Sequence, residues 1–244
     1  MSEESAPALN EPFGVGRDAA RLFFDFAVML SLFAKHRNNR VLDFACGTGW
    51  ISEFLSRAGF DVTGVDIDAN AESVFSERLK ADKRIDSKRF RFHHADGHRL
   101  PFDDGLFGHL VCFDALHHMA DYKTVFSEIF RILDKQGRAI FVEPGAKHST
   151  SKETREFIAK YKNNDPTWLE KDVILEEISV LAKDAGFKEA RIVPQMLPNF
   201  KTYPIDDWVR FVKHHQIRSP LGTDYLRHLA SLNYDGRVIF YLQK

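Results

Sequence analysis

Cysteine is scarce in this sequence, with only Cys46 and Cys112 among 244 residues. Both lie in apolar, strand-like segments. Two cysteines in a chain of this size do not make a disulfide framework, so a reducing compartment is expected. The segment from Met1 to Pro12 is small, acidic and polar, and it lacks the basic start and apolar run of a secretion signal. These features predict a cytoplasmic protein.

Long hydrophobic runs and an excess of one charge are also missing. The most apolar stretch, 22–34, contains Asp25 and is too short to span a bilayer, so no membrane insertion is predicted. The 34 basic and 35 acidic side chains give a net charge of −1, and no nucleic-acid partner is expected. Phenylalanine is abundant, with 22 residues. We interpret these rings as core packing, with contacts to an apolar substrate as the alternative.

Short apolar strands alternate with amphipathic helices along the chain, which is typical of a parallel, doubly wound α/β sheet. Residues 1–12 are expected to be disordered. Residues 13–244 are expected to form a single domain, with substrate-covering insertions near 146–168 and 194–235. Strands are predicted at 40–44, 61–65, 90–94, 110–113, 138–143, 187–193 and 236–242. Helices are predicted at 16–36, 50–58, 69–80, 122–133 and 169–185.

A turn of small residues follows the first predicted strand. Ala45, Gly47 and Gly49 come directly after Asp43 at the strand end. Small residues allow a ligand to approach the backbone closely, and the free N–H groups of the next helix are its polar partners. The alternative is a tight strand-to-helix turn that binds nothing, and the glycine pattern alone does not distinguish the two.

Acidic residues at the ends of the next two predicted strands favour the interpretation that the turn binds a ligand. Asp66 lies about 23 residues after Asp43, where a carboxylate accepts hydrogen bonds from both ribose hydroxyls. Asp96, followed by Gly97, can accept from an adenine amino group. Asp66 could instead cap the following helix, although Asp68 is placed for that role, and Asp96-Gly97 could be a simple turn. Three such signals at three successive strand ends predict an adenosine-shaped site.

Four segments carry a resemblance to a known family. Residues 41–49 resemble the first motif of class I S-adenosylmethionine-dependent methyltransferases, and 95–104 look like their adenine-site motif. Residues 113–119 are similar to the fourth-strand motif of the type 11 group, and 131–138 match the usual approach to the fifth strand. The resemblance implies a Rossmann-like, mostly parallel seven-stranded sheet with the last strand antiparallel. Ala45 departs from the family, which often has glycine there.

The same resemblance implies S-adenosylmethionine as the cofactor and assigns its contacts. A nicotinamide dinucleotide fits worse, because the turn has no third glycine at the dinucleotide spacing. The implied contacts are Asp43, Ala45, Cys46, Gly47 and Gly49 for the methionine part, Asp66 and Ile67 for the ribose and adenine edge, Asp96 and Gly97 for the adenine, and Phe113 through Leu116 for the sulfonium side.

Two histidines follow the fourth strand, where the transferable methyl should lie. A hydroxyl acceptor must lose a proton, and imidazole titrates near neutral pH. His117 and His118 are therefore the candidate catalytic bases, although a role in orienting the cofactor is favoured over catalysis. No metal site is predicted, because His93 and His94 are adjacent on a strand and face opposite ways.

The acceptor is predicted from the aromatic and polar residues of the two insertions. Faces to stack on and edges that form hydrogen bonds suit a sugar, and 168–178 resembles methyltransferases linked to bacterial surface-glycan synthesis. We therefore expect a small-molecule or glycan hydroxyl as acceptor. An apolar quinone or lipid, a protein acceptor, and a cofactor-binding protein without turnover stay open, as does the oligomeric state.

Overall fold

The computed structural model describes residues 9–13, 18–33, 37–161, 168–193 and 220–244. The strands are β1 (Arg40–Phe44), β2 (Asp61–Asp66), β3 (Phe90–His94), β4 (Phe107–Phe113), β5 (Leu133–Pro144), β6 (Glu189–Ile192) and β7 (Arg237–Gln243). The helices are α2 (Asp18–Ser31), α3 (Trp50–Arg57), α4 (Ala71–Ala81), η2 (Leu116–His118), α5 (Tyr122–Ile132), α6 (Lys152–Tyr161), α7 (Leu175–Ala185), α9 (Pro220–Ser231) and η3 (Leu232–Gly236).

The strands form one seven-stranded sheet in the order β3-β2-β1-β4-β5-β7-β6. The pairs from β3 through β5 are parallel, whereas β7 runs antiparallel to both β5 and β6. The predicted doubly wound sheet with an antiparallel last strand is therefore confirmed. The chain builds outward from β1 to β3 and then crosses back to β4, so the direction of winding reverses between β1 and β4.

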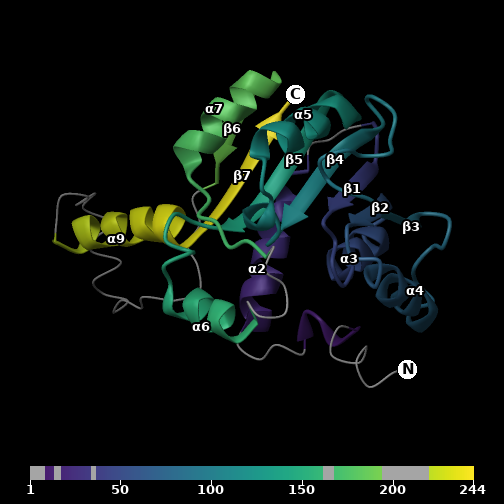
Figure 1. Cartoon of the computed structure of the whole chain (residues 1–244), viewed down its shortest axis with the longest axis horizontal. Helices are drawn as coiled ribbons and strands as arrows, with labels where there is room; N and C mark the ends of the chain where they lie inside the picture. Colours follow the sequence, from purple (N-terminus) through teal and green to yellow (C-terminus); the bar gives the residue numbers. More distant parts are fainter. Residues whose placement is uncertain (1–8, 14–17, 34–36, 162–167, 194–219) are drawn as a thin grey trace.

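Two helical layers cover the two faces of the sheet (Figure 1). Successive side chains along a strand point to opposite faces, so each strand packs against both layers. On β5, Ile140 and Val142 belong to the cluster beneath α2 and α3. Ala139 and Phe141 belong to the cluster beneath α5 and α7. All four side chains have no exposed surface, which is why the parallel strands read as continuous apolar runs.

Several predicted boundaries were wrong. The helix expected at 169–185 begins at Leu175, and the chain before it is extended. Strands β4 and β5 start earlier than expected, at Phe107 and Leu133. Helices α6 and α9 were not predicted. Figure 1 shows both outside the two layers, toward the edge where β4 and β5 end.

The predicted insertions and terminal segment are only partly within the described residues. The insertion near 146–168 includes α6, and most of 194–235 lies outside the described residues. Of the segment expected to be disordered, 1–8 also lies outside them. Glu11 contacts the domain, because its carboxylate accepts from Thr48 Oγ1 at 2.5 Å and its carbonyl oxygen accepts from Arg78 at 3.3 Å. No helix in the described part of the chain combines the length and hydrophobicity needed to cross a bilayer.

Candidate functional site

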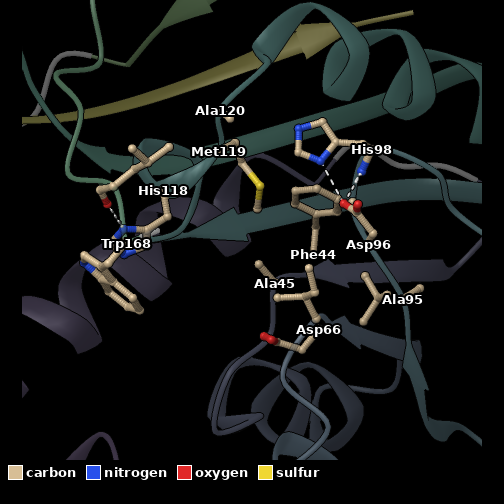
Figure 2. Close-up of a pocket in the computed structure, with 14 residues that line it drawn as sticks. Phe44, Ala45, Asp66, Ala95, Asp96, His98, His118, Met119, Ala120 and Trp168 are labelled. Atoms are coloured by element: carbon tan, nitrogen blue, oxygen red, sulfur yellow. Dashed lines mark hydrogen bonds and ion pairs between the residues drawn. The ribbon is translucent and has the colours of Figure 1, made fainter. Parts of the chain in front are cut away.

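A cavity of about 350 Å³ opens at the carboxyl ends of β1, β2 and β3, beside the loop that follows β4. This is the edge of a doubly wound sheet where ligands bind, next to the reversal of winding. Figure 2 shows side chains from β1 to β3 facing His118 and Trp168 across it. Its lining residues are Phe44, Ala45, Val65, Asp66, Ile67, Ala95, Asp96, Gly97, His98, His118, Met119, Ala120, Trp168 and Leu169.

Left-handed backbone shapes the turn after β1. Ala45, Gly47 and Gly49 have φ values of 54°, 49° and 74°, a region that glycine adopts without cost and an L side chain adopts at about 1–2 kcal/mol. A Cβ atom on Gly49 would also lie 2.6 Å from the Phe75 ring. These angles give a physical reason why glycine is favoured at position 45, where this sequence has alanine.

Asp66 ties the end of β2 to this turn. Its carboxylate accepts from the backbone N–H of Gly47 at 2.7 Å and from that of Asp68 at 2.9 Å. Ile67 follows it on the cavity wall with an exposed side chain. The structure thus places Asp66 and Ile67, the residues expected to contact the ribose and adenine edge, on the cavity wall.

Asp96 and Gly97 follow β3 and also line the cavity. The Asp96 carboxylate accepts from the backbone N–H and ring Nδ1 of His98, at 2.9 and 2.7 Å. These hydrogen bonds, the backbone one first, lower the pKa of Asp96. Gly97 packs on the Phe44 ring so closely that a Cβ atom would lie 2.4 Å from Cζ.

Asp43 and Cys46 are not among the residues that line the cavity. Asp43 is buried at the end of β1, where it accepts from Ser52 Oγ at 2.6 Å. Burial raises its pKa to about 7, although the Ser52 hydrogen bond opposes the shift. Cys46 is buried too, and burial followed by the charge of Asp43 raises the pKa of its thiol. Both side chains support the turn from inside the domain.

The predicted contacts after β4 need a similar correction. Leu116 has no exposed surface and packs in the core beneath α5. Phe113 is edge-on to Trp50, with ring centroids 5.2 Å apart. Neither residue lines the cavity. Gly47 and Gly49 belong to the turn after β1 and are not among the lining residues either. Residues 118–120 supply this wall instead.

Glu143 fixes the loop after β4, a role that the sequence did not reveal. Its fully buried carboxylate accepts from the backbone N–H groups of Ala115 and Leu116, at 3.1 and 2.9 Å, and contacts His117 Nδ1 at 2.8 Å. One carboxylate at the end of β5 thereby satisfies three donors of the neighbouring loop. Because a buried charge needs such partners, loop and strand are held as a unit.

A second ionic group holds the start of the same loop. Asp114 has a φ of 52°, and it accepts from Arg237 Nη1 and Nη2 at 2.5 and 3.1 Å. Arg237 also bonds Asp25 of α2. Burial alone would raise the pKa of Asp114, but the charge of Arg237 outweighs it and lowers the pKa. The strained residue is thus fixed by the first residue of β7.

The two adjacent histidines occupy different environments. His117 is buried, and its Nδ1 contacts Glu143 while its Nε2 lies 3.6 Å from Glu170. Burial would lower the pKa of His117, but Glu143, with Asp114 and Glu170, raises it. His118 lines the cavity, and its Nδ1 contacts the Leu169 carbonyl at 2.7 Å. Burial, followed by the charge of His117, lowers the pKa of His118.

Residues 168–170 complete the site from the second half of the chain. The rings of Trp168 and His118 have centroids 4.5 Å apart, and both face the cavity (Figure 2). Glu170 accepts from Trp168 Nε1 at 2.7 Å. The sequence places 168 within an acceptor-covering insertion, whereas the structure places it on the wall of the predicted cofactor cavity.

The fold and cavity together define an α/β protein with a candidate ligand site at the carboxyl edge of a doubly wound sheet. Comparison with known proteins shows what this protein is similar to. Residues 42–141 match the family model described as a methyltransferase domain, Methyltransf_11. YqeM of Bacillus subtilis (strain 168), a protein named for methyltransferase activity, is 29% identical over 185 residues, 74% of this chain and 67% of the relative. Demethylmenaquinone methyltransferase of Clavibacter sepedonicus is 33% identical over 104 residues, 43% of this chain and 40% of the relative.

A solved structure extends the likeness over most of the fold. Phosphoethanolamine N-methyltransferase 2 of Haemonchus contortus, in complex with S-adenosyl-L-methionine, superposes with a TM-score of 0.62 at 21% identity. The match covers 91% of this chain and 52% of that one, so this chain spans about half the length of that protein. Residues 42–141 thus match a methyltransferase domain, and the protein is similar in sequence and in fold to methyltransferases, one of them solved with S-adenosyl-L-methionine bound.

Proposed function

We propose that S-adenosylmethionine binds in the 350 Å³ cavity with its ribose on Asp66 and its adenine beside Asp96 and Gly97. The convergence of these residues at three adjacent strand ends is the observation that carries the proposal. The turn of 45–49 faces the methionine part, with Asp43 and Cys46 acting from behind it. A cavity of this size lies within the range of small-molecule sites, roughly 300–1000 Å³.

His118 is the proposed general base for transfer to a hydroxyl of a small molecule or glycan. A carbonyl oxygen only accepts, so the contact with Leu169 places the proton on Nδ1 and leaves the Nε2 lone pair free. S-adenosylmethionine bound in the cavity would supply the methyl group to the acceptor oxygen, and His118 Nε2 would take up the proton that this oxygen loses. His117, enclosed by Glu143 and Glu170, is a positioning residue.

An apolar quinone is the second candidate acceptor. The cavity walls include the apolar side chains of Phe44, Met119 and Leu169. Relatives from Clavibacter sepedonicus and Lactococcus lactis subsp. lactis (strain IL1403), 33% and 34% identical over 104 and 107 residues, are named demethylmenaquinone methyltransferases. A quinol also presents a hydroxyl, so the same base would serve. Residues 13–244 act as one methyltransferase domain in either case.

Cofactor binding is tested by calorimetry on Asp66→Ala. Loss of hydrogen bonds to a charged group costs about 1.5–3 kcal/mol, which lowers affinity roughly 10- to 150-fold. Asp86→Ala is the matched control, because Asp86 is an exposed aspartate that accepts from nearby backbone outside the cavity. Equal affinities for the two variants would refute the ribose assignment.

The acceptor is tested by transfer of a labelled methyl group from the cofactor to sugars, phenols and quinols. Labelled sugar or phenol supports the first acceptor class, and labelled quinol alone supports the second. Tight cofactor binding without transfer to any class would refute turnover and leave a binding protein.

A further inference from the structure

Three side chains from separate segments converge behind the cavity wall. They are His117 of η2, His148 after β5, and Glu170 before α7. Glu170 Oε2 lies 2.6 Å from His148 Nε2 and 3.6 Å from His117 Nε2. The ligand atoms of all three lie within 4.8 Å of one another. Two imidazole nitrogens and a carboxylate oxygen thus face a common point.

Each of the three side chains also makes a second polar contact, through the ring nitrogen or carboxylate oxygen that does not face the common point. Histidines that bind metals are oriented by a second contact of this kind, usually to a carboxylate, carbonyl or hydroxyl-bearing group, and this contact also selects the ring tautomer. The second contacts are His117 Nδ1 to Glu143 Oε2 at 2.8 Å, His148 Nδ1 to Thr154 Oγ1 at 3.2 Å, and Trp168 Nε1 to Glu170 Oε1 at 2.7 Å.

The distance between His117 Nε2 and Glu170 Oε2 favours a cation site over a direct hydrogen bond between the two side chains. A charge-assisted N–H···O bond is about 2.7–2.9 Å long, whereas these two atoms are 3.6 Å apart with side chains only 6% and 7% exposed. His117 Nδ1 already contacts Glu143 Oε2 at 2.8 Å, so Nε2 is the ring atom that faces the Glu170 carboxylate oxygen. A cation bound between these two buried atoms would give each of them a partner across a gap that is too long for a direct hydrogen bond.

We propose that His117, His148 and Glu170 bind one divalent transition-metal ion of the zinc class. Two imidazoles and one carboxylate suit Zn²⁺ and its neighbours, whereas Mg²⁺ and Ca²⁺ prefer oxygen ligands. The ion would replace the His148–Glu170 hydrogen bond. It would join residues 168–170, on the cavity wall, to the end of β5 and the loop after β4. No local sequence pattern indicates this site, because its ligands are 31 and 22 residues apart.

The site is tested on the tag-free full chain without cofactor, by calorimetric titration with Zn²⁺ and by the visible spectrum of bound Co²⁺. We expect one ion per chain and a Co²⁺ spectrum of low coordination number. His148→Ala and Glu170→Gln each remove a ligand and should weaken binding at least 10- to 100-fold, the loss seen for outer contacts alone. His93→Ala, which removes an exposed histidine of β3, should bind as the parent does.

Thermal unfolding with and without Zn²⁺ separates a lost site from a lost fold. The parent should be stabilised by Zn²⁺, while a folded His148→Ala protein should not. His148 is 20% exposed at the side chain, so its replacement is the milder of the two. Binding of less than one ion per chain, or equal Zn²⁺ affinity in the parent, His148→Ala and Glu170→Gln, would show that the three residues form only a hydrogen-bonded cluster.

Discussion

A single methyl group at position 97 should disturb both the cofactor cavity and the core. In Gly97→Ala the new Cβ atom would lie 2.4 Å from Phe44 Cζ and 2.7 Å from Cε2. Ordinary contact begins near 3.4 Å, so the two groups must separate by about 1 Å. The Phe44 ring is 1% exposed and packs within the cluster that includes Leu42, Val65 and Leu110, which blocks its retreat.

The loss of stability or of cofactor affinity in Gly97→Ala depends on whether the Phe44 ring or the loop of Asp96 and Gly97 moves. Overpacking a filled core destabilises a protein by about 1–3 kcal/mol. In a protein of this size each kcal/mol lowers the Tm by about 2–4 °C. If instead the loop of Asp96 and Gly97 moves outward, the adenine contacts that we propose for this loop are lost. Affinity for S-adenosylmethionine then falls by at least about tenfold, the value of one good hydrogen bond.

Thermal unfolding and cofactor calorimetry measure these two outcomes together. Gly236→Ala is the control, because a Cβ atom there meets nothing within 4 Å. Phe44→Leu removes the ring atoms that clash, so the Gly97→Ala/Phe44→Leu double variant should lose about 0.5–3 kcal/mol less than the sum of the single changes. Unchanged Tm and affinity in Gly97→Ala, or strict additivity with Phe44→Leu, would refute the packing argument.

Three further changes probe the buried carboxylates and the proposed base. Glu143→Gln should lower the free energy of unfolding by about 2 kcal/mol, because it removes a charge that binds three donors. Urea unfolding in the presence of a metal chelator measures this loss, and an unchanged urea midpoint would contradict it. Asp43, with a pKa of about 7 against 3.8 ordinarily, holds a proton in the folded state between these values, so acidification from pH 8 to 5 should stabilise the parent more than Asp43→Asn, and equal pH slopes would exclude it. His118→Gln should lower kcat about 10²- to 10⁴-fold with little change in KM for the cofactor, whereas equal small losses in His118→Gln and His117→Gln would indicate orienting roles only.

The parallel sheet and the polar residues at its strand ends could be predicted from the sequence for a geometric reason. Parallel strands place their carboxyl ends on one edge of the sheet, so Asp66 and Asp96 had to approach the turn after β1 once the alternation was recognised. Helix α6 was missed because its ten residues are largely solvated. Of those whose side chains the structure describes, only Thr154 is buried, so the helix leaves a weak apolar signal.

The partners of the two histidines could not be predicted from the sequence. Glu143 meets His117 only because β4 and β5 pair with Phe113 opposite Val142, a register that no local pattern specifies. The family resemblance implied that Asp43 contacts the cofactor, but the Asp43 carboxylate is buried in the domain and accepts from Ser52 Oγ. Burial of a polar side chain is a tertiary property, and it decided these assignments.

The extended chain before α7 shows how such contacts override helix propensity. From 169 onward the sequence suits a helix, yet the helix starts at Leu175 because the preceding backbone and side chains are already bonded elsewhere. The Lys171 N–H donates to the His117 carbonyl at 3.0 Å, the Leu169 carbonyl accepts from His118, and Val173 is fully buried. A helix beginning at 169 would turn the Leu169 carbonyl into an intrahelical hydrogen bond and would leave the Lys171 N–H among the unpaired donors of its first turn. It would also withdraw Trp168 and Leu169 from the cavity wall, so the bonds that delay the helix are the ones that close the site.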